Sequence, residues 1–150
     1  MDALDLQILE RLQANGRSRY TAIAKDLGVA EGTIRNRVGK LMDDGALQII
    51  GMVDPHKIGY NAPALIGISI QPPHLDTAAS AIAALPQVSY LILVSGGFDL
   101  MVEVMCEDRE CLATFLRDEL HNIPGVQRTE TFTILHTYKM SHSAQPQERG

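Results

Sequence analysis

Cysteine is scarce in this sequence, since only two of its 150 residues, Cys106 and Cys111, are of this type. They stand five positions apart and lack the Cys-x-x-Cys spacing that is typical of zinc sites and thiol redox sites. We therefore expect both thiols to pack in a hydrophobic core.

Long apolar runs are also absent. No segment approaches the roughly 20 apolar residues that a membrane-spanning helix needs. The first residues, Met-Asp-Ala-Leu-Asp, form neither a basic leader nor an apolar one. With 45% hydrophobic and 21% charged residues, the composition is that of an ordinary globular protein. We expect a cytoplasmic protein with no membrane partner, built around one sizeable core or two small ones.

The sequence contains none of the common catalytic or metal-binding motifs. Its five histidines are scattered, and no two of them lie four positions apart beside a carboxylate, as they do in zinc proteases. There is no Gly-x-Ser-x-Gly nucleophile elbow, no phosphate-binding loop and no complete Gly-x-Gly-x-x-Gly run. The sequence therefore predicts no enzyme, no catalytic residue, no metal site and no cofactor.

What the sequence does contain is a local reversal of charge. The whole chain has a formal net charge of -5, yet residues 17–40 carry six basic and two acidic side chains, a net charge of +4. The part after Tyr60 carries five basic and ten acidic side chains, so it holds the whole negative excess. This distribution indicates two domains with different surfaces, and it makes the first of them a candidate for binding DNA.

The basic segment lies in a region where three helices are expected. Leu4, Ile8 and Leu12 recur at the spacing of one helical face, and residues 20–27 repeat that pattern. Gly28 then stands where a left-handed residue can turn the chain sharply.

The third helix is expected from about Glu31 to Asp44. It begins after Ala30, whose side chain offers no hydrogen bond to the first turn. With the apolar segment 46–53 as a wing, the order of elements predicts a winged helix-turn-helix DNA-binding domain with a linker strand in residues 1–60.

A rotation of about 100° per residue places two different faces on this third helix. The apolar face consists of Ile34, Val38 and Leu41. The donor face consists of Thr33, Asn36, Arg37 and Lys40. In the major groove arginine reads guanine, asparagine reads adenine, and lysine or threonine holds phosphate. We therefore expect the donor face to bind DNA.

Three further arginines are expected to flank the donor face as phosphate contacts or salt-bridge partners, namely Arg17, Arg19 and Arg35. The alternative is an ordinary solvated helix face.

Several segments of the chain are also similar to a known family. These segments are LDLQILERLQANGR, AIAKDLGV, GTIRNRVGKLMDDGALQIIGMVDPHKIGY and SGGFDL, which occur in this order between about Leu4 and Tyr138. In them the chain resembles the leucine-responsive regulator/asparagine regulator (Lrp/AsnC) family of prokaryotic transcription factors. The resemblance implies homodimers, or tetramers or octamers made of dimers, that bind pseudo-palindromic double-stranded DNA operators. It also implies a response to an amino acid or a related small molecule.

The second region, residues 61–140, repeats its own pattern. Strands and helices alternate as β-α-β twice, over residues 64–71, 75–84, 90–94, 100–106, 109–121 and 129–135. This order predicts a ferredoxin-like βαββαβ sandwich, so the whole chain is expected to be of the α+β class. Two helices cover only one face of the sheet, while strand alternation leaves apolar residues on both faces. The uncovered face is therefore expected to pack on another subunit.

A glycine-rich loop joins the second and third predicted strands. It consists of Ser95, Gly96, Gly97, Phe98 and Asp99, and it matches the effector-loop position of the family that the chain resembles. The two glycines allow backbone N–H groups to approach a ligand carboxylate, and Asp99 is a candidate partner for an α-ammonium group. The resemblance also places the last strand beside this loop, which makes the Thr131 and Thr133 hydroxyls candidate ligand contacts. The alternative is a hairpin turn in which Asp99 accepts N–H groups of the turn itself, while the two threonines only favour a strand.

These patterns predict a sequence-specific transcriptional regulator that senses a small-molecule effector. Two other functions stay open at this point. One is a nucleoid-organising protein that binds DNA with little sequence preference, and the other is a small amino-acid-binding metabolic protein. The polar segment 141–150 lacks periodicity and is expected to be a disordered tail.

Overall fold

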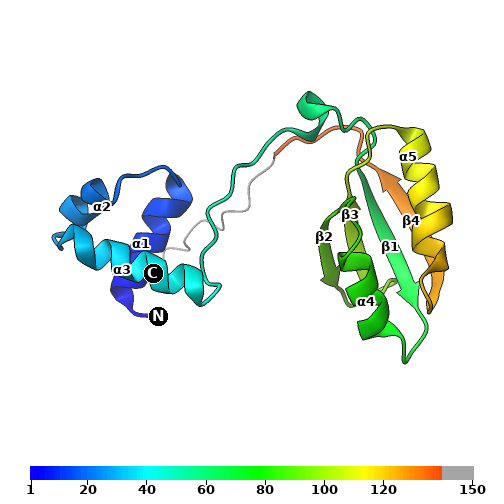
Figure 1. The fold of residues 1–150 in the computed structure, drawn as a ribbon, viewed down its shortest axis with the longest axis horizontal. Helices are drawn as coiled ribbons and strands as arrows, with labels where there is room; N and C mark the ends of the chain where they lie inside the picture. The colour runs from blue at the N-terminus through cyan, green and yellow to red at the C-terminus, as the bar shows by residue number, and fades with distance from the viewer. Residues whose placement is uncertain (140–150) are drawn as a thin grey trace. The chain divides into compact units, whose positions relative to one another are not determined.

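The computed structural model of the protein describes residues 1–139, and these form two compact units, residues 1–52 and 53–138 (Figure 1). Each unit has a hydrophobic core of its own. The predicted disordered tail, 141–150, lies outside the described residues. Among the residues that are described, no helix has the length and apolar character needed to cross a membrane.

The N-terminal unit consists of three helices: α1 (Ala3–Ala14), α2 (Tyr20–Leu27) and α3 (Glu31–Asp43). Their apolar faces meet in a core of six buried residues, which are Ile8, Leu12, Ile23, Ala24, Ile34 and Val38. The tight turn after α2 is made by Gly28, which has a φ of 67° in the left-handed region that favours glycine. The predicted three-helix arrangement is therefore confirmed, with helix ends within about one residue of those expected.

The predicted wing is not formed by strands in the described part of the chain. After α3 the N–H groups of Ala46 and Leu47 both donate to the carbonyl of Leu41, and residues 47–54 then contain neither helix nor strand. A strand is stable only when another strand pairs with it, and this three-helix unit contains none. A short 3-10 helix, Pro55–Ile58, follows.

The C-terminal unit has the predicted βαββαβ order. It contains β1 (Ala64–Ile70), α4 (Leu75–Ala83), β2 (Val88–Leu93), β3 (Leu100–Val104), α5 (Arg109–Thr114) and β4 (Val126–Thr133). The α5 helix continues as a π-helical turn, Phe115–Glu119, and a 3-10 turn, Leu120–Asn122. The four strands form one sheet in the order β2-β3-β1-β4, and all neighbours are antiparallel. This order places β3 between β1 and β2, as a ferredoxin-like fold requires.

Both helices of this unit cover the same face of the sheet (Figure 1). The inward residues of β1 and β3 are buried there against Ala78 and Ile82 of α4 and Phe115 of the π-helical turn. Cys106 is fully buried in this core and Cys111 packs against it, which confirms their predicted packing role. Burial is the main cause that raises the pKa of the Cys106 thiol to about 12, so this thiol stays neutral.

The other side of the sheet, here called the open face, is not covered by any helix of the unit. Strand pairing aligns Tyr90 and Ile92 of β2, Met101 of β3, Leu65 of β1 and Phe132 of β4 on this side. Leu65 is 38% exposed, Ile92 37%, Phe132 45% and Tyr90 56%. A sheet face that exposes this many large apolar side chains marks an interaction surface.

Candidate DNA-binding and effector sites

Helix α3 presents one face to the core and another to solvent, as its sequence predicts. Ile34, Val38 and Leu41 are buried, while Asn36 and Lys40 on the opposite side are exposed. At its start, Ala30 makes no side-chain cap, whereas α1 begins with a full capping box. The candidate reading face of α3 thus contains Asn36 and Lys40, with Thr33 half-buried beside them.

Arg37 of the predicted donor face lies in a different environment. Its Nη1 atom donates to Asp2 Oδ2 at 2.5 Å and to Asp5 Oδ1 at 3.1 Å. The same two aspartates form the capping box of α1, in which each side chain accepts the backbone N–H of the other residue. Asp5 is the one buried charged residue of the described chain, at 8% exposure. Arg37 therefore joins α3 to the first turn of α1, and its base-reading role stays a prediction.

The contact between Arg37 and Asp2 makes the N-terminal unit sensitive to acid. The pKa of the Asp2 carboxyl is lowered, first by the backbone N–H of Asp5 and then by the Arg37 guanidinium. A carboxyl with a depressed folded-state pKa stabilises the fold above its unfolded pKa of about 4, and that stability is lost as pH falls through the lower folded value. We therefore expect the melting temperature of the unit to fall as the pH drops below about 4. In the Arg37→Ala variant the melting temperature should depend less on pH.

Circular dichroism melts at a series of pH values test this expectation. Arg35→Ala is the matched control, because it removes the same charge from the same helix without touching Asp2. It should keep the parental pH dependence. An Arg37→Ala variant whose melting temperature varies with pH as the parent's does would show that the contact adds no stability.

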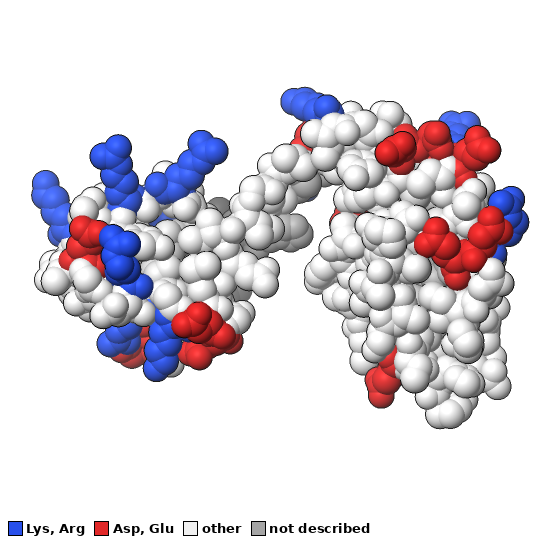
Figure 2. Space-filling view, viewed as in Figure 1, with Lys and Arg blue, Asp and Glu red and all other residues white. Residues whose placement is uncertain are grey.

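The other predicted DNA contacts divide into paired and unpaired cations. Arg35 Nη2 lies 2.6 Å from Glu31 Oε1 one helical turn away, and its guanidinium carbon lies 5.7 Å from the centroid of the Tyr20 ring. Arg17, Arg19 and Lys40 form no ion pair with any residue in the range 1–139. Figure 2 shows basic side chains projecting from the N-terminal unit, where they are free to meet phosphate.

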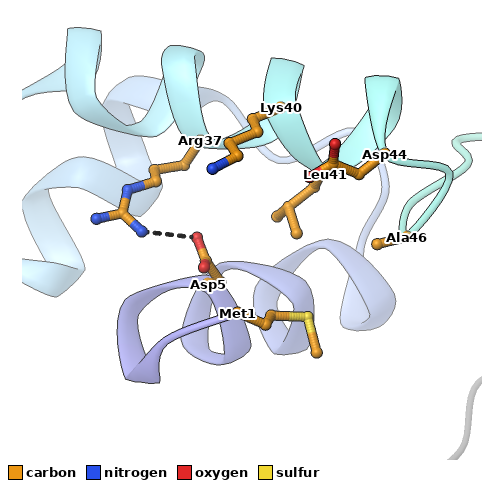
Figure 3. A pocket seen from close by; sticks show the side chains of 7 residues that line it. All are labelled: Met1, Asp5, Arg37, Lys40, Leu41, Asp44 and Ala46. Carbon is orange, nitrogen blue, oxygen red and sulfur yellow. Dashed lines mark hydrogen bonds and ion pairs between the residues drawn. The ribbon is translucent and has the colours of Figure 1, made fainter.

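A hollow of about 300 Å³ adjoins the Arg37 contact (Figure 3). It is lined by Met1, Asp5, Arg37, Lys40, Leu41, Asp44 and Ala46. In Figure 3, Arg37 and Lys40 extend from α3 toward α1, and Arg37 meets Asp5 there. The lining mixes both signs of charge, so the hollow offers no net charge to an anion or a cation.

The predicted effector loop, residues 95–99, folds back over the open face. A Cβ atom on Gly67 of β1 would lie 2.5 Å from the Phe98 ring, so the ring covers this glycine and requires it. The Arg128 guanidinium of β4 lies 5.0 Å from the ring centroid, and its Nη2 donates to the Gly97 carbonyl at 3.4 Å. These contacts place β4 beside the loop, as the family resemblance implies.

Asp99 has a structural task in the loop. Its Oδ2 accepts the Ile70 N–H at 2.7 Å, its own N–H donates to the Ile68 carbonyl, and its carbonyl accepts the Val94 N–H. The Asp99 carboxylate thus accepts an N–H group of β1 rather than one of the turn, and its other oxygen is left for other partners. The N–H groups of Gly96 and Gly97 have no acceptor among residues 1–139, so they remain available to a ligand. Ser95 is exposed and makes no side-chain hydrogen bond there.

The structure separates Thr131 and Thr133 from this loop. Thr131 pairs with Ile66 and Thr133 with Ala64, whose side chains are buried on the helix-covered face. Paired residues of neighbouring strands point to the same side of a sheet. The two hydroxyls therefore lie on the opposite side from Phe98, and the prediction that they join the loop in one site is wrong for a single chain.

Three residues near these sites were missed by sequence reasoning, namely Asp2, Asp5 and Arg128. Asp2 and Asp5 carry a recognisable signal, because an acidic pair three positions apart at a helix start is typical of a capping box. Arg128 carries no such signal, since its side of the sheet depends on the register between β1 and β4. Within the described residues, no three metal-binding side chains form a cluster.

Comparisons with known proteins assign both units to described domain families. The AsnC-type helix-turn-helix domain matches residues 1–42, and the Lrp/AsnC ligand binding domain matches residues 63–144. An uncharacterised HTH-type transcriptional regulator of Pyrococcus horikoshii is 37% identical over 147 residues, which cover 97% of this chain and 99% of the relative. A second such regulator, from Pyrococcus furiosus, is 33% identical over 95% of this chain and 97% of its own.

Solved structures give the same result. Escherichia coli AsnC is 30% identical and superposes with a TM-score of 0.78, covering 93% of this chain and 95% of that one. A transcriptional regulator from Neisseria meningitidis, solved in complex with L-methionine, is 23% identical with a TM-score of 0.82 over 97% and 96% of the two chains. The second similarity is one of fold alone. These matched proteins are regulators of transcription rather than enzymes.

Proposed function

Since the chain belongs to the Lrp/AsnC family of transcriptional regulators, we propose that it acts as a dimer or a larger assembly of dimers that binds pseudo-palindromic operators. Its helix-turn-helix unit binds DNA, and its C-terminal unit is a ligand-binding domain. The proposed location of this regulator is the cytoplasm, where it is associated with DNA. The observation that carries the proposal is the exposed face of α3, opposite a buried apolar face in a family-matched helix-turn-helix.

The proposal assigns different tasks to the residues around α3. Asn36 and Thr33 contact base edges, because asparagine and threonine offer hydrogen bonds in the major groove. Lys40, Arg17 and Arg19, which are unpaired among the described residues, contact phosphates. Arg35 also contacts a phosphate once its ion pair with Glu31 is broken. Arg37 fixes the position of α3 against α1 and adds charge at the same surface.

A second copy of the chain completes the site. The three-helix unit presents a single recognition helix, and a pseudo-palindromic operator has two half-sites about one helical turn of DNA apart. The open face supplies an isologous interface, since its apolar side chains would be buried against the same side chains of the other copy.

The effector is proposed to be an amino acid or a related small molecule that binds at the loop 95–99. The free N–H groups of Gly96 and Gly97 support this, because paired backbone donors suit a carboxylate. The Neisseria meningitidis regulator of similar fold has L-methionine bound.

The DNA-binding proposal is tested with operator fragments, which are first selected from genomic DNA by the purified protein with and without a mixture of amino acids. Asn36→Ala should weaken binding to a selected operator by about 1–3 kcal/mol and leave binding to random DNA nearly unchanged. Lys40→Ala should weaken binding to the operator and to random DNA alike. It should also lower the slope of log affinity against log salt concentration by about one, because one phosphate contact is lost.

The two variants serve as controls for each other, since both shorten an exposed side chain of α3. Fluorescence anisotropy on labelled duplexes of equal length measures both affinities. Equal losses on operator and random DNA for Asn36→Ala would instead assign this residue to the phosphate backbone. That outcome would favour an architectural protein with low sequence preference.

A further inference from the structure

The contact between Arg37 and the start of α1 uses every oxygen of two carboxylates. Asp2 accepts the Asp5 N–H with Oδ1 and an Arg37 N–H with Oδ2. Asp5 accepts the Asp2 N–H with Oδ2 and an Arg37 N–H with Oδ1. Both bonds from Arg37 come from one nitrogen, Nη1. The two aspartates thus form a clamp that holds the guanidinium by one of its three nitrogens.

The rest of this guanidinium is free. Nε and Nη2 of Arg37 donate to no residue in the range 1–139, and the side chain is 37% exposed. In Figure 3 one nitrogen of Arg37 bonds to Asp5, and the other two point away from that aspartate. Nε and Nη2 form an edge with which arginine can bind two acceptors at once. The clamp therefore leaves a bidentate donor edge without a partner in the described chain.

This free edge belongs to the side of α3 that is proposed to bind DNA. Arg37 follows Thr33 by four residues and precedes Lys40 by three, so the three side chains are neighbours on the helix surface. The clamp fixes the position of the guanidinium before DNA arrives. Fewer side-chain conformations are then lost when the free edge meets its acceptors.

The charge of the clamp decides which group of DNA the edge fits. Two carboxylates and one guanidinium sum to a net charge of -1. A phosphate at this edge would meet two carboxylates close behind the guanidinium, and like charges repel. Guanine instead presents two neutral acceptors, O6 and N7, which one arginine edge binds together in the major groove. The clamp therefore favours guanine over phosphate.

We propose that Asp2 and Asp5 are positioning residues for DNA recognition, which hold Arg37 so that its Nε and Nη2 read a guanine in each operator half-site. This inference rests on the proposed DNA-binding function and assigns residues that determine its specificity. Loss of one carboxylate from the clamp then has two opposite effects. Binding to any DNA becomes stronger because a negative charge is removed, whereas the preference for the operator becomes weaker because the arginine is held less firmly. A contact that only stabilised the fold would not separate these two affinities.

The test compares the full-length parent with Asp2→Asn, Asp5→Asn and Arg37→Lys. Fluorescence anisotropy measures the affinity for the selected operator and for random DNA of equal length. Asparagine retains a side-chain oxygen that can cap a helix. Lysine keeps the charge of Arg37, but its single nitrogen cannot replace a planar fork. Glu31→Gln is the matched control, because it removes the same charge from an ion pair with Arg35 on the same helix.

Asp2→Asn should bind random DNA roughly two- to fivefold more tightly than the parent. Its preference for the operator over random DNA should fall roughly 2- to 10-fold. Arg37→Lys should bind random DNA like the parent and lose roughly 5- to 150-fold of the preference. Glu31→Gln should strengthen binding to both DNAs equally and keep the parental preference.

Asp5→Asn should resemble Asp2→Asn. Asp5 is buried, so circular dichroism first establishes that this variant is folded. If it is not, Asp2→Asn and Arg37→Lys decide the question, since Asp2 is half exposed.

Modified bases identify the guanine that Arg37 reads. The guanines of the operator are replaced one at a time by 7-deazaguanine, which has a carbon in place of N7. One replacement in each half-site should weaken binding by the parent and leave binding by Arg37→Lys nearly unchanged. The same replacement should weaken Asp2→Asn less than the parent.

Three results would overturn the inference. If Asp2→Asn strengthens binding to both DNAs equally, as Glu31→Gln does, the clamp has no part in specificity, and DNA binding by α3 still stands. If no replaced guanine distinguishes the parent from Arg37→Lys, the free edge does not read a base. A parent protein that shows no preference for its selected operator would contradict the proposed function itself, and the inference would fall with it.

Discussion

Ile92→Asp is expected to convert the protein into a monomer and to weaken operator binding by roughly 100-fold or more. Ile92 lies on the open face, next to Met101 of β3, and is 37% exposed in a single chain. In the proposed dimer this side chain is buried against the second copy, and a carboxylate there would lose its water without gaining a partner. A monomer binds one half-site at a time, so the gain from simultaneous binding disappears.

Leu93→Asp is the matched control for this variant. Leu93 is the next residue of β2, is more exposed at 67%, and points to the opposite side of the sheet, in register with Leu100. It should leave both the mass and the operator affinity near parental values. Sedimentation velocity and fluorescence anisotropy measure the two quantities, and a dimeric Ile92→Asp protein would exclude the open face as the interface.

Ile34→Ala is expected to unfold the N-terminal unit while the C-terminal unit stays folded. Ile34 is fully buried in a core of only six residues, and truncation of a buried isoleucine to alanine costs about 2–5 kcal/mol. So small a unit has little stability to lose. The second core contains none of the affected residues, so the chain should melt in two transitions, of which only one moves.

Calorimetry and DNA titration together test this expectation. Operator binding should be lost, whereas oligomer mass and amino-acid binding should persist. Ile50→Ala removes the same atoms from a side chain that is 67% exposed, and it should change stability by no more than about 0.5 kcal/mol. A single transition that shifts as a whole would show instead that the two units unfold together.

The helices and strands of both units were predictable because their signals are local. The spacing of Ile8 and Leu12, or of Ile34 and Val38, identifies a buried helix face without knowledge of its partner. Alternation in β1 likewise separates Ile66 and Ile68 from Leu65. The predicted wing failed because its formation does not depend on a local signal alone. Residues 46–53 could form a strand only by pairing with a second strand, and the N-terminal unit does not contain one.

The site was predicted less completely, because its residues depend on contacts between distant segments. On a helical wheel Arg37 lies at the border of the donor face, and the wheel cannot show that Asp2 and Asp5 lie within reach. The error at Thr131 and Thr133 has a similar origin. Proximity of β4 to the loop was correctly inferred, but the register with β1 decides which side of the strand faces it.

The contact between Gly67 and Phe98 has a consequence for the evolution of this family. The ring occupies the space that any side chain at position 67 would need. Relatives that carry a larger residue there must therefore carry a smaller one at position 98, or move the loop. Across an alignment of relatives, the side-chain volumes at positions 67 and 98 should therefore be anticorrelated. The sum of the two volumes should vary less than either volume alone. Compensating pairs of this kind would identify relatives whose effector loop is shaped differently.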